Sequence, residues 1–531
     1  MKNKLSLYGL PMAVNLVLFI PFIFFLTPVY NTNEDVYILY LLSGNFGDPP
    51  TEVLHYNHLM HPYLNIVIKN LFVFDPNRNW YSITLFLSHY LACCTILYQL
   101  LKKSSKKPES LLWYITLFII FEGRMLLNIN FTNTAIVLTC SASILLFTSN
   151  KTGVWNVKGT FWAIIFLVYA SLFRIHVLIP MLGISLPFIF LQFSRIKLIA
   201  VTLALIFAGS LILLFNHLHK LYYKSAIIAW QQEESYRQKV YFFYNHHNLD
   251  TTTSGTKWET ELGLINNGSP IDTNFLSSRN LVAMRKDLQD KKTIISAVSA
   301  GGKNWFWINN RLYFAIGILL IMLSMQSREL LLVSVISLVV TVCGFYILFF
   351  YAKLPEYLKI YSLFLLGLFI IFFSSEKRPS YKYAVVLNMS FFLLSVWGII
   401  QLYKISRRNL EETTQFRLCA REVSSCREKL FVLTADIFPL QKFYVFDLPG
   451  KFALPNLIGS EHFLQNIYHP AFKRYGITHL KDLPKHSNVL FWGKRVPALE
   501  TYFREVNGRE VSVSDALKEF ECGEVRSISF K

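Results

Sequence analysis

Long apolar stretches alternate with short polar segments along the first four fifths of the chain. Each apolar stretch has roughly 17 to 25 residues and few charges, which is the length of helix that crosses the hydrocarbon core of a membrane. Their repetition predicts a polytopic α-helical membrane protein with about 11 transmembrane helices. The predicted spans are residues 10–28, 84–101, 110–125, 133–149, 160–174, 176–193, 197–215, 308–325, 330–350, 356–374 and 383–403.

Two long polar segments interrupt these spans and are predicted to lie outside the membrane. Residues 29–83 form the first outer loop, in which the stretch 62–74 mixes apolar residues with Asn and Lys, a pattern typical of an interfacial helix. Residues 216–307 form a larger outer loop, rich in Asn and Thr. Unstructured loops of this length are uncommon unless they have a role, so we expect a functional or partner-binding flap.

The pattern changes after the last span. Residues 1–403 are predicted to form the transmembrane domain, and residues 404–531 a small extracytoplasmic α/β domain. Strand-like runs alternate with helix-like stretches in this second part. The strand-like runs are residues 430–433, 443–446, 489–491 and 511–513, and the helix-like stretches are residues 461–475 and 498–506.

Composition agrees with a membrane protein. Of the 531 residues, 53% are hydrophobic and 16% charged, which is too apolar for a string of soluble domains. The net charge of +19 is spread over the loops without a dense basic tract, so it favours contact with the lipid bilayer and argues against a nucleic-acid partner. Because no small-residue cleavage site follows the first apolar run, we expect this run to remain as an uncleaved anchor.

The positions of Lys and Arg predict the orientation of the chain. If the N-terminus is cytoplasmic, most positive residues near the spans face inward, as the positive-inside rule requires. The inner residues are Lys2, Lys4, Lys102, Lys103, Lys106, Lys107, Lys151, Lys158, Arg195, Lys197, Arg328, Lys377, Arg378 and Lys382. The short outer segments hold Lys69, Arg78, Arg124, Arg174, Lys353 and Lys359. An odd number of crossings then places the C-terminal domain outside.

The cysteines fall into two groups. Four lie in predicted spans and are expected to act as small apolar side chains: Cys93, Cys94, Cys140 and Cys343. The other three, Cys419, Cys426 and Cys522, lie in the outward tail, where a disulfide can form. The sequence leaves their pairing open.

An acidic pair, Glu34 and Asp35, directly follows the first span. Carboxylates at the edge of a hydrophobic bundle are costly unless they are paired, hydrated or used, so this pair is the best indication of chemistry in the chain. The residues from Val36 onward have a helical pattern. Asp35 could therefore alternatively be the N-cap of a helix.

This organisation resembles the GT-C superfamily of polytopic membrane glycosyltransferases, in a poorly characterised bacterial branch. The likeness covers the first span with its acidic pair, the long first outer loop, the hydrophobic bundle and the outward C-terminal domain. Three short motifs strengthen it. They are Asn33-Glu34-Asp35-Val36-Tyr37 with Leu42-Ser43-Gly44, Asn130-Phe131-Thr132-Asn133-Thr134-Ala135, and Phe173-Arg174.

The resemblance implies transfer of a sugar from a polyprenyl-phosphate donor to a glycan, lipid or protein acceptor on the outer face of the membrane. The acceptor hydroxyl must lose a proton as it attacks, and the resembled motif makes Asp35 the catalytic base with Glu34 in support. Arg174, Arg124 and the neighbouring His176 are the expected contacts of the donor phosphate. The implied setting is a bacterial cytoplasmic membrane, with an endoplasmic-reticulum membrane as the alternative of equal topology.

Further candidates for substrate contacts are Tyr37, His58, His61 and Asn133. The spacing of three between His55, His58 and His61 would suit a metal on one helix face. Because a proline follows directly and no cysteine or carboxylate completes a zinc set, the sequence favours a loop with one substrate-contacting histidine. No cofactor is predicted, and a divalent metal is not indicated.

Two of the phosphate candidates have structural alternatives. Arg124 could instead form a salt bridge to Glu122 or reach toward the lipid headgroups. His176 could be an interfacial histidine hydrogen-bonded to backbone.

Three other function classes compete with a transferase. A transporter or flippase is disfavoured because no two-fold repeat is visible and the ionisable residues gather at the outer edge instead of mid-membrane. A surface-polysaccharide polymerase would suit the large loop at residues 216–307, although such enzymes generally rely on loop arginines. A non-catalytic scaffold stays open because the tail carries no recognisable catalytic motif.

Overall fold

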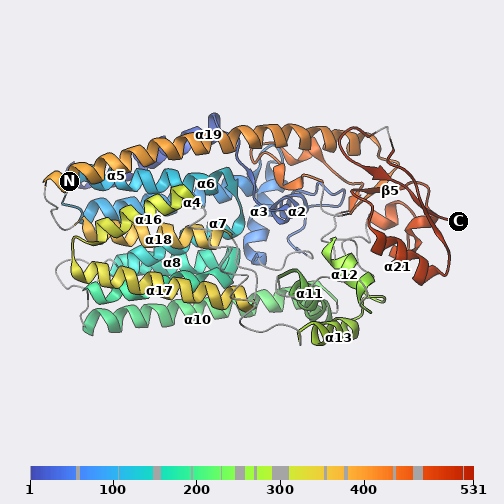
Figure 1. Cartoon of the computed structure of the whole chain (residues 1–531), viewed down its shortest axis with the longest axis horizontal. Helices are drawn as coiled ribbons and strands as arrows, with labels where there is room; N and C mark the ends of the chain where they lie inside the picture. Colours follow the sequence, from blue (N-terminus) through green and yellow to red (C-terminus); the bar gives the residue numbers. More distant parts are fainter. Residues whose placement is uncertain are drawn as a thin grey trace.

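Helices that run side by side make up most of the molecule, which is described by a computed structural model (Figure 1). The structure describes residues 2–54, 60–105, 107–147, 157–192, 195–228, 230–245, 257–267, 272–289, 310–351, 356–375, 381–434, 438–458, 471–517 and 520–531. The bundle helices are α1 (Lys2–Phe24), α4 (Trp80–Lys103), α5 (Lys107–Leu117), α6 (Gly123–Leu127), α7 (Phe131–Phe147), α8 (Val157–Arg174), α9 (Leu178–Ser185), α10 (Arg195–Ala226), α16 (Arg311–Ser324), α17 (Arg328–Tyr351), α18 (Glu356–Ser374) and α19 (Tyr381–Ser425).

Among the described residues, seven helical stretches are long and apolar enough, by length and composition, to cross a membrane. They are Trp80–Lys103, Lys107–Leu127, Val157–Leu191, Leu198–Ala226, Arg328–Tyr346, Glu356–Ser374 and Ala384–Ser425. Shorter apolar helices lie at Gly9–Phe24, Pro62–Phe74, Phe131–Phe147 and Arg311–Ser324. A mostly helical protein with several membrane-type helices is therefore confirmed, and the number of crossings stays a prediction.

The two chain ends lie at opposite ends of the bundle (Figure 1). The N-terminus is at one end, and the C-terminal region packs against the other, which we call the tail end. This arrangement agrees with an odd number of crossings. Which end faces the outside of the cell stays a prediction.

The sixth predicted span, residues 176–193, is not a continuous α-helix. The eight-residue α9 is flanked by two 3-10 segments, Ile175–Val177 and Leu186–Gln192. Pro180 and Pro187 lie in this region, and proline has no backbone N–H to donate to the preceding turn. A count of apolar residues does not register the helix-breaking effect of proline. The sequence pattern therefore predicts one continuous helix here.

The longest helix, α19, has 45 residues and continues from the bundle to the tail (Figure 1). The predicted domain boundary at residue 404 therefore falls inside a helix. The buried Asn409 fastens α19 where it leaves the bundle, because its amide donates to the carbonyls of Thr27 at 3.0 Å and Leu127 at 3.1 Å. In the same way, α10 extends to Ala226, past the predicted start of the large loop.

Two helices fill the first loop at the tail end, α2 (Asn33–Ser43) and α3 (Pro62–Phe74). The helix predicted over residues 62–74 thus has the predicted bounds. Short strands β1 (Val29–Tyr30) and β2 (Asn128–Ile129) pair in parallel and join this loop to the start of α7. Gly44 ends α2 in the left-handed conformation, at φ 77°, where a side chain would meet Pro50.

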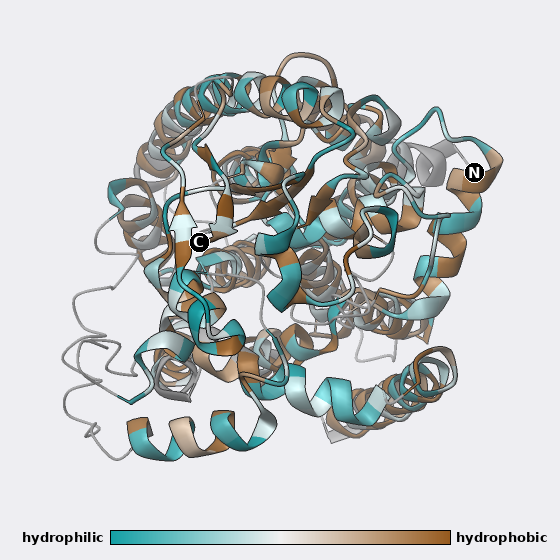
Figure 2. Cartoon of the chain, turned by 90° about the vertical axis from the view of Figure 1, so that its right-hand side faces the viewer, coloured by the Kyte–Doolittle hydropathy of each residue, from teal (hydrophilic) through white to brown (hydrophobic). Residues whose placement is uncertain are grey.

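The tail contains a small mixed sheet with helices around it (Figure 2). Its strands have the order β4-β3-β5-β7, in which β7 is antiparallel to its neighbour and the others are parallel. The strands are β3 (Leu430–Leu433), β4 (Leu457–Ile458), β5 (Val489–Trp492) and β7 (Val525–Arg526), and a separate antiparallel pair consists of β6 (Val511–Val513) and β8 (Ile528–Phe530). With α21 (Pro497–Asn507), this confirms a small mixed α/β region.

The prediction of a strand at residues 443–446 is wrong. This run makes only one isolated bridge, between Tyr444 and Val29, and the Val445 N–H donates to the carbonyl of Pro28 at 3.2 Å. Its apolar residues pack against the bundle instead of against a sheet. Packing on helices produces the same alternation of buried and more exposed residues that a strand has. The helix predicted over 461–475 falls mostly outside the described residues.

The large loop packs against the tail. It contains α11 (Trp230–Asn245), α12 (Glu259–Asn266) and α13 (Ser278–Gln289), which share a small apolar core. Gly263 of α12 lies against Ala498 of α21, and the Tyr502 hydroxyl donates to Asp272 Oδ2 at 2.8 Å.

The tail also holds the first loop in place. The Tyr40 hydroxyl of α2 donates to the carbonyl of Phe452 at 2.6 Å, and the Asn33 side chain accepts from the backbone N–H of Gln441 at 2.9 Å. A disulfide between Cys419 and Cys522 ties the end of α19 to the C-terminal segment, which resolves the pairing that the sequence left open.

Candidate functional site

The acidic pair lies in the first turn of α2, at the tail end of the bundle. Thr32 is the N-cap of this helix, so the alternative in which Asp35 is the cap is wrong. Asp35 is the third helical residue, and the Thr32 hydroxyl donates to its Oδ2 at 2.6 Å. Because backbone N–H groups point out of a helix start, negative charge is favourable there.

The Asp35 carboxylate is fully buried and joins three parts of the chain. The Tyr81 hydroxyl of α4 donates to its Oδ1 at 2.7 Å, and the backbone N–H of Phe131, the first residue of α7, donates to the same atom at 3.1 Å. Burial raises the pKa of Asp35 to about 7, since the loss of hydration outweighs its three hydrogen bonds and the Glu34 carboxylate adds to the shift. A carboxyl with this pKa gains and loses its proton near neutral pH, as a general base does.

Glu34 is half-buried and is the more accessible member of the pair. It acts electrostatically on Asp35 and on the hydroxyl of Tyr357, at the start of α18. The same hydroxyl lies beside Thr132 of α7 and within electrostatic reach of Arg174. We call the following five residues the tail-end polar cluster: Glu34, Asp35, Thr132, Arg174 and Tyr357.

Arg174 is the last residue of α8, where the backbone becomes extended. Its Nη1 donates to Thr132 Oγ1 at 2.7 Å, and its guanidinium carbon lies 5.6 Å from the centre of the Phe131 ring. Its Nε is buried and has no hydrogen-bond partner among the described residues, and none of their carboxylates forms an ion pair with it. A guanidinium with an unsatisfied donor is well suited to a phosphate oxygen.

Arg124, the other predicted phosphate contact, is already paired. Its Nη2 lies 2.8 Å from Glu356 Oε1, and its Nη1 donates to the Tyr313 hydroxyl at 2.9 Å. The alternative salt bridge to Glu122 is not formed. No hydrogen bond or ion pair within the described ranges joins Arg124 to the tail-end polar cluster.

A cavity of about 770 Å³ opens where the end of α8, the last turns of α10 and the first turns of α11 meet. We call it the basic cavity, because Glu234 is its only acidic lining residue in the described part of the chain and is paired with Arg237 at 2.6 Å. The imidazole of His176 lies within electrostatic reach of both Arg174 and Arg237, so it connects the cavity to the tail-end polar cluster. Basic and imidazole side chains line it: His61, His176, His217, His219, Lys220, Lys224 and Arg237.

His61 lines the cavity, but its ring is engaged by the protein. Its Nδ1 accepts from the Tyr63 N–H at 3.2 Å, which makes His61 the N-cap of α3, and its Nε2 lies 2.9 Å from the carbonyl of Phe215. Burial lowers the pKa of His61, which favours the neutral ring. His58 lies outside the described residues.

The other two predicted substrate contacts are buried in the bundle. Tyr37 packs its ring 5.6 Å from that of Phe46. Asn133 donates from its side chain to the carbonyl of Asn128 at 3.1 Å, and its own N–H is held by the side chain of Asn130 at 2.6 Å. Neither residue lines the basic cavity.

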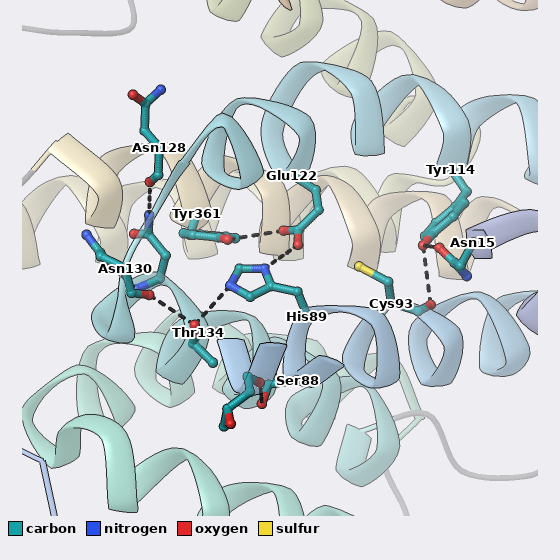
Figure 3. A network of polar contacts seen from close by, with 12 residues as sticks. Asn15, Ser88, His89, Cys93, Tyr114, Glu122, Asn128, Asn130, Thr134 and Tyr361 are labelled. Atoms are coloured by element: carbon teal, nitrogen blue, oxygen red, sulfur yellow. Dashed lines mark hydrogen bonds and ion pairs between the residues drawn. The ribbon is translucent and has the colours of Figure 1, made fainter. Parts of the chain in front are cut away.

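The sequence reading missed an ionisable pair inside the bundle (Figure 3). His89 of α4 and Glu122 are fully buried, with Nδ1 and Oε1 2.5 Å apart. His89 lies in the predicted span 84–101 and Glu122 in the predicted span 110–125, and their depth in the membrane stays a prediction. Both positions lie within predicted spans, so a polar residue inside each apolar run was the available signal.

No group of three metal-ligating side chains comes together among the residues that the structure describes. Comparisons with protein-family models, with curated proteins and with solved structures found no match for this chain. The resemblance to membrane glycosyltransferases therefore rests on the residues named above, and it stays a prediction.

Proposed function

We propose that this chain is a membrane glycosyltransferase that moves a sugar from a polyprenyl-phosphate-linked donor to an acceptor hydroxyl at the tail end of the bundle. One observation carries the proposal. Arg174, whose buried Nε has no hydrogen-bond partner among the described residues, acts electrostatically on Tyr357, as both carboxylates do, and on His176, which lines the basic cavity. Acceptor activation requires the carboxylates, and a phosphate leaving group requires the positive charges.

In the proposed reaction, the acceptor oxygen attacks the anomeric carbon of the sugar. A new carbon–oxygen bond forms, the bond to the phosphate oxygen breaks, and its electron pair stays on the phosphate. The acceptor proton goes to a carboxylate of the acidic pair, a step that contributes ~10²- to 10⁴-fold to rate. Arg174 and His176 stabilise the growing phosphate charge, and the basic cavity holds the donor headgroup.

The burial of Asp35 bears on which carboxylate takes the proton. Asp35 is fully buried and accepts three hydrogen bonds, whereas Glu34 is half-buried. This difference supports Glu34 as the residue that touches the acceptor, with Asp35 fixing the turn that carries it. Asp35 as the base stays a prediction, which its pKa of about 7 supports.

The proposed location is a bacterial cytoplasmic membrane with the N-terminus cytoplasmic and the tail outside. The Cys419–Cys522 disulfide supports this orientation, because structural disulfides persist in oxidising compartments. Cys426 is a partly exposed free thiol in the tail. A membrane-impermeant maleimide should modify Cys426 in intact cells, and modification only after lysis would reverse the orientation.

The experiment that tests the function is a mass profile of lipid-linked and surface glycans from cells with the intact gene, no gene or single substitutions at matched protein level. Gene deletion, Glu34→Gln and Arg174→Ala should remove the same sugar increment. Arg124→Ala is the matched control and should keep the increment, because the Arg124 guanidinium is already bonded to Glu356 and Tyr313.

The outcome that contradicts the proposal is equally specific. If deletion removes the increment while Glu34→Gln, Asp35→Asn and Arg174→Ala all preserve it, the cluster does not carry the chemistry. A polymerase or scaffold then becomes the better account.

A transporter of lipid-linked glycans is the second candidate, favoured by the ionisable His89–Glu122 pair inside the bundle. A transporter deletion should leave the lipid-linked glycan complete but confined to the inner face. A transferase deletion should leave it one sugar short.

A further inference from the structure

The buried His89–Glu122 pair is the centre of a network that reaches three helices (Figure 3). Glu122 Oε1 is bonded to His89 of α4, and Glu122 Oε2 accepts from the Tyr361 hydroxyl of α18 at 3.1 Å. On its other side, the His89 ring reaches Thr134 of α7, with Nε2 and Oγ1 3.1 Å apart. The Thr134 hydroxyl gives its own proton to the carbonyl of Asn130 at 3.0 Å.

These hydrogen bonds fix the directions of the protons. Because the Thr134 proton is used toward Asn130, His89 Nε2 is the donor to Thr134 and carries a hydrogen. One proton then remains to be shared between His89 Nδ1 and Glu122. Each end of the pair thus holds a different helix through a directional bond.

The same three helices carry the contacts of the tail-end polar cluster. Tyr81 of α4 binds Asp35 and lies about two turns from His89 on the same helix. The first turn of α7 supplies the Phe131 N–H to Asp35 and Thr132 to Arg174, and Thr134 belongs to the same turn. Helices α4 and α7 therefore each contact both the cluster and the buried network.

The pattern continues on α18. Tyr357 belongs to the cluster, and Tyr361 lies one turn deeper on the same face. Glu122 itself is the last residue of a π-helical turn, Phe118–Glu122, that separates α5 from α6. Such turns are rare, and they recur at functional sites because they redirect a side chain. Here the carboxylate points between α4 and α18 (Figure 3).

We propose that His89 and Glu122 are positioning residues, which set the relative height and rotation of α4, α7 and α18 and thereby align the tail-end polar cluster. This inference rests on the proposed function. Apolar packing alone lets neighbouring helices slide and rotate by small amounts, whereas directional bonds to a shared pair fix one register. Apolar residues of equal volume would avoid the cost of burying the pair, so its presence indicates a requirement for geometry.

The test compares Glu122→Ala with Glu122→Gln, whose amide NH2 can donate to His89 Nδ1 while its oxygen accepts from the Tyr361 hydroxyl. Thr134→Val breaks one arm of the network, and Ser141→Ala is its matched control. Ser141 also has a buried hydroxyl on α7, but this hydroxyl has no hydrogen-bond partner among the described residues.

The first measurement is hydrogen exchange at the Phe131 amide, the group that α7 donates to Asp35. Glu122→Ala and Thr134→Val should accelerate this exchange roughly tenfold or more, as expected for local opening, while amides deeper in α7 stay protected. Glu122→Gln and Ser141→Ala should match the original protein. Should Glu122→Ala fail to fold, Thr134→Val against Ser141→Ala gives the same comparison.

The second measurement is turnover in purified protein with a polyprenyl-phosphate sugar donor. Glu122→Ala should lower kcat with little change in the KM for the donor, and Glu122→Gln should restore kcat. Unchanged exchange in both Glu122→Ala and Thr134→Val would overturn the inference, as would a Gln variant as impaired as the Ala variant. If the original protein transfers no sugar, the proposed function fails, and the exchange measurement still decides whether the pair sets the register.

Discussion

Helices α18 and α10 are both membrane-type helices, yet they occupy opposite environments. The apolar window of α18 is 89% buried inside the protein, whereas that of α10 is only 17% buried. The more buried helix is the less hydrophobic of the two. It carries Tyr357 and Tyr361, whose hydroxyls reach the polar cluster and the buried network.

The difference follows from the two surroundings. A helix that faces lipid must be apolar around its circumference, because lipid offers no hydrogen-bond partner. A helix surrounded by other helices can carry polar groups wherever a neighbour satisfies them. The polar residues of α10 that line the basic cavity lie in its last turns. Position in the bundle therefore decides where this chain can place chemistry.

The largest effect expected from this comparison is the loss of the buried pair. Glu122→Ala leaves His89 and Tyr361 without their acceptor and should lower the free energy of unfolding by ~3–5 kcal/mol. Ser210→Ala on α10, at an exposed hydroxyl bonded only within its own helix, should change it by less than ~0.5 kcal/mol. Unfolding in mixed micelles measures both. Equal losses would remove the distinction between the two environments.

A second prediction concerns pH. Asp35 joins α2 to the buried helices α4 and α7, and its pKa rises from 3.8 to about 7 on folding. The folded state therefore holds the proton more tightly, and stability should fall as the pH rises from about 4 to 7, by on the order of 2–4 kcal/mol. Thermal unfolding of the original protein should show this fall, and Asp35→Asn should lack it.

Glu52, which binds α10, has a pKa shifted in the opposite direction from that of Asp35. It binds Lys69 of α3 at 2.6 Å and Tyr222 of α10 at 2.7 Å, and these hydrogen bonds outweigh desolvation and lower its pKa. Its contribution is present above its unfolded pKa and is lost as the pH falls below it. Glu52→Gln should remove this acid-side loss without changing the slope between about pH 4 and 7 that Asp35 produces.

Glycine substitutions give a third and smaller contrast. A side chain at Gly367 of α18 would begin 3.1 Å from Leu117 and 3.2 Å from Leu320, whereas one at Gly209 of α10 would meet nothing within 4 Å. Gly367→Leu should therefore overpack the core and cost ~1–3 kcal/mol. Gly209→Leu should be tolerated, and a comparable loss at both positions would show that α10 is also covered.

The smallest predicted effect lies on α17, another peripheral helix. The buried Ser337 hydroxyl donates to the carbonyl of Ile184 in α9 at 2.6 Å, while the buried Ser334 hydroxyl has no partner among the described residues. Ser337→Ala should cost ~0.5–1.5 kcal/mol, and Ser334→Ala should be near neutral. Thermal unfolding of the two variants side by side checks the difference.

Much of the fold was predictable because apolar length and periodicity are local properties. The bounds of α3 and the strands at residues 430–433 and 511–513 follow from short runs of sequence. The strand expected at residues 443–446 failed because alternation does not distinguish a sheet face from a surface docked on helices. Irregularity in the sixth span came from prolines, which a count of apolar residues ignores.

The candidate site was predictable only in part. Glu34, Asp35 and Arg174 stood out because charges beside apolar spans are rare. Tyr81, Thr132 and Tyr357 did not, because hydroxyl side chains are common at helix ends.

The remaining parts depend on contacts between distant residues. His89 and Glu122 are 33 positions apart, and only the packing of their helices makes them a pair. The basic residues of the cavity lie at the end of a span and in a polar loop. Positive charge is common in both places, so it does not indicate a site.

The length of α19 makes it a continuous connection between the two parts of the molecule. Asn409 anchors the helix to the carbonyls of Thr27 and Leu127. At 1.5 Å per residue, about 42 Å of helix lies on the bundle side of this anchor and about 24 Å on the tail side. The tail segments that bind Asn33 and Tyr40 of α2, the helix of the acidic pair, are therefore held in place from within the bundle.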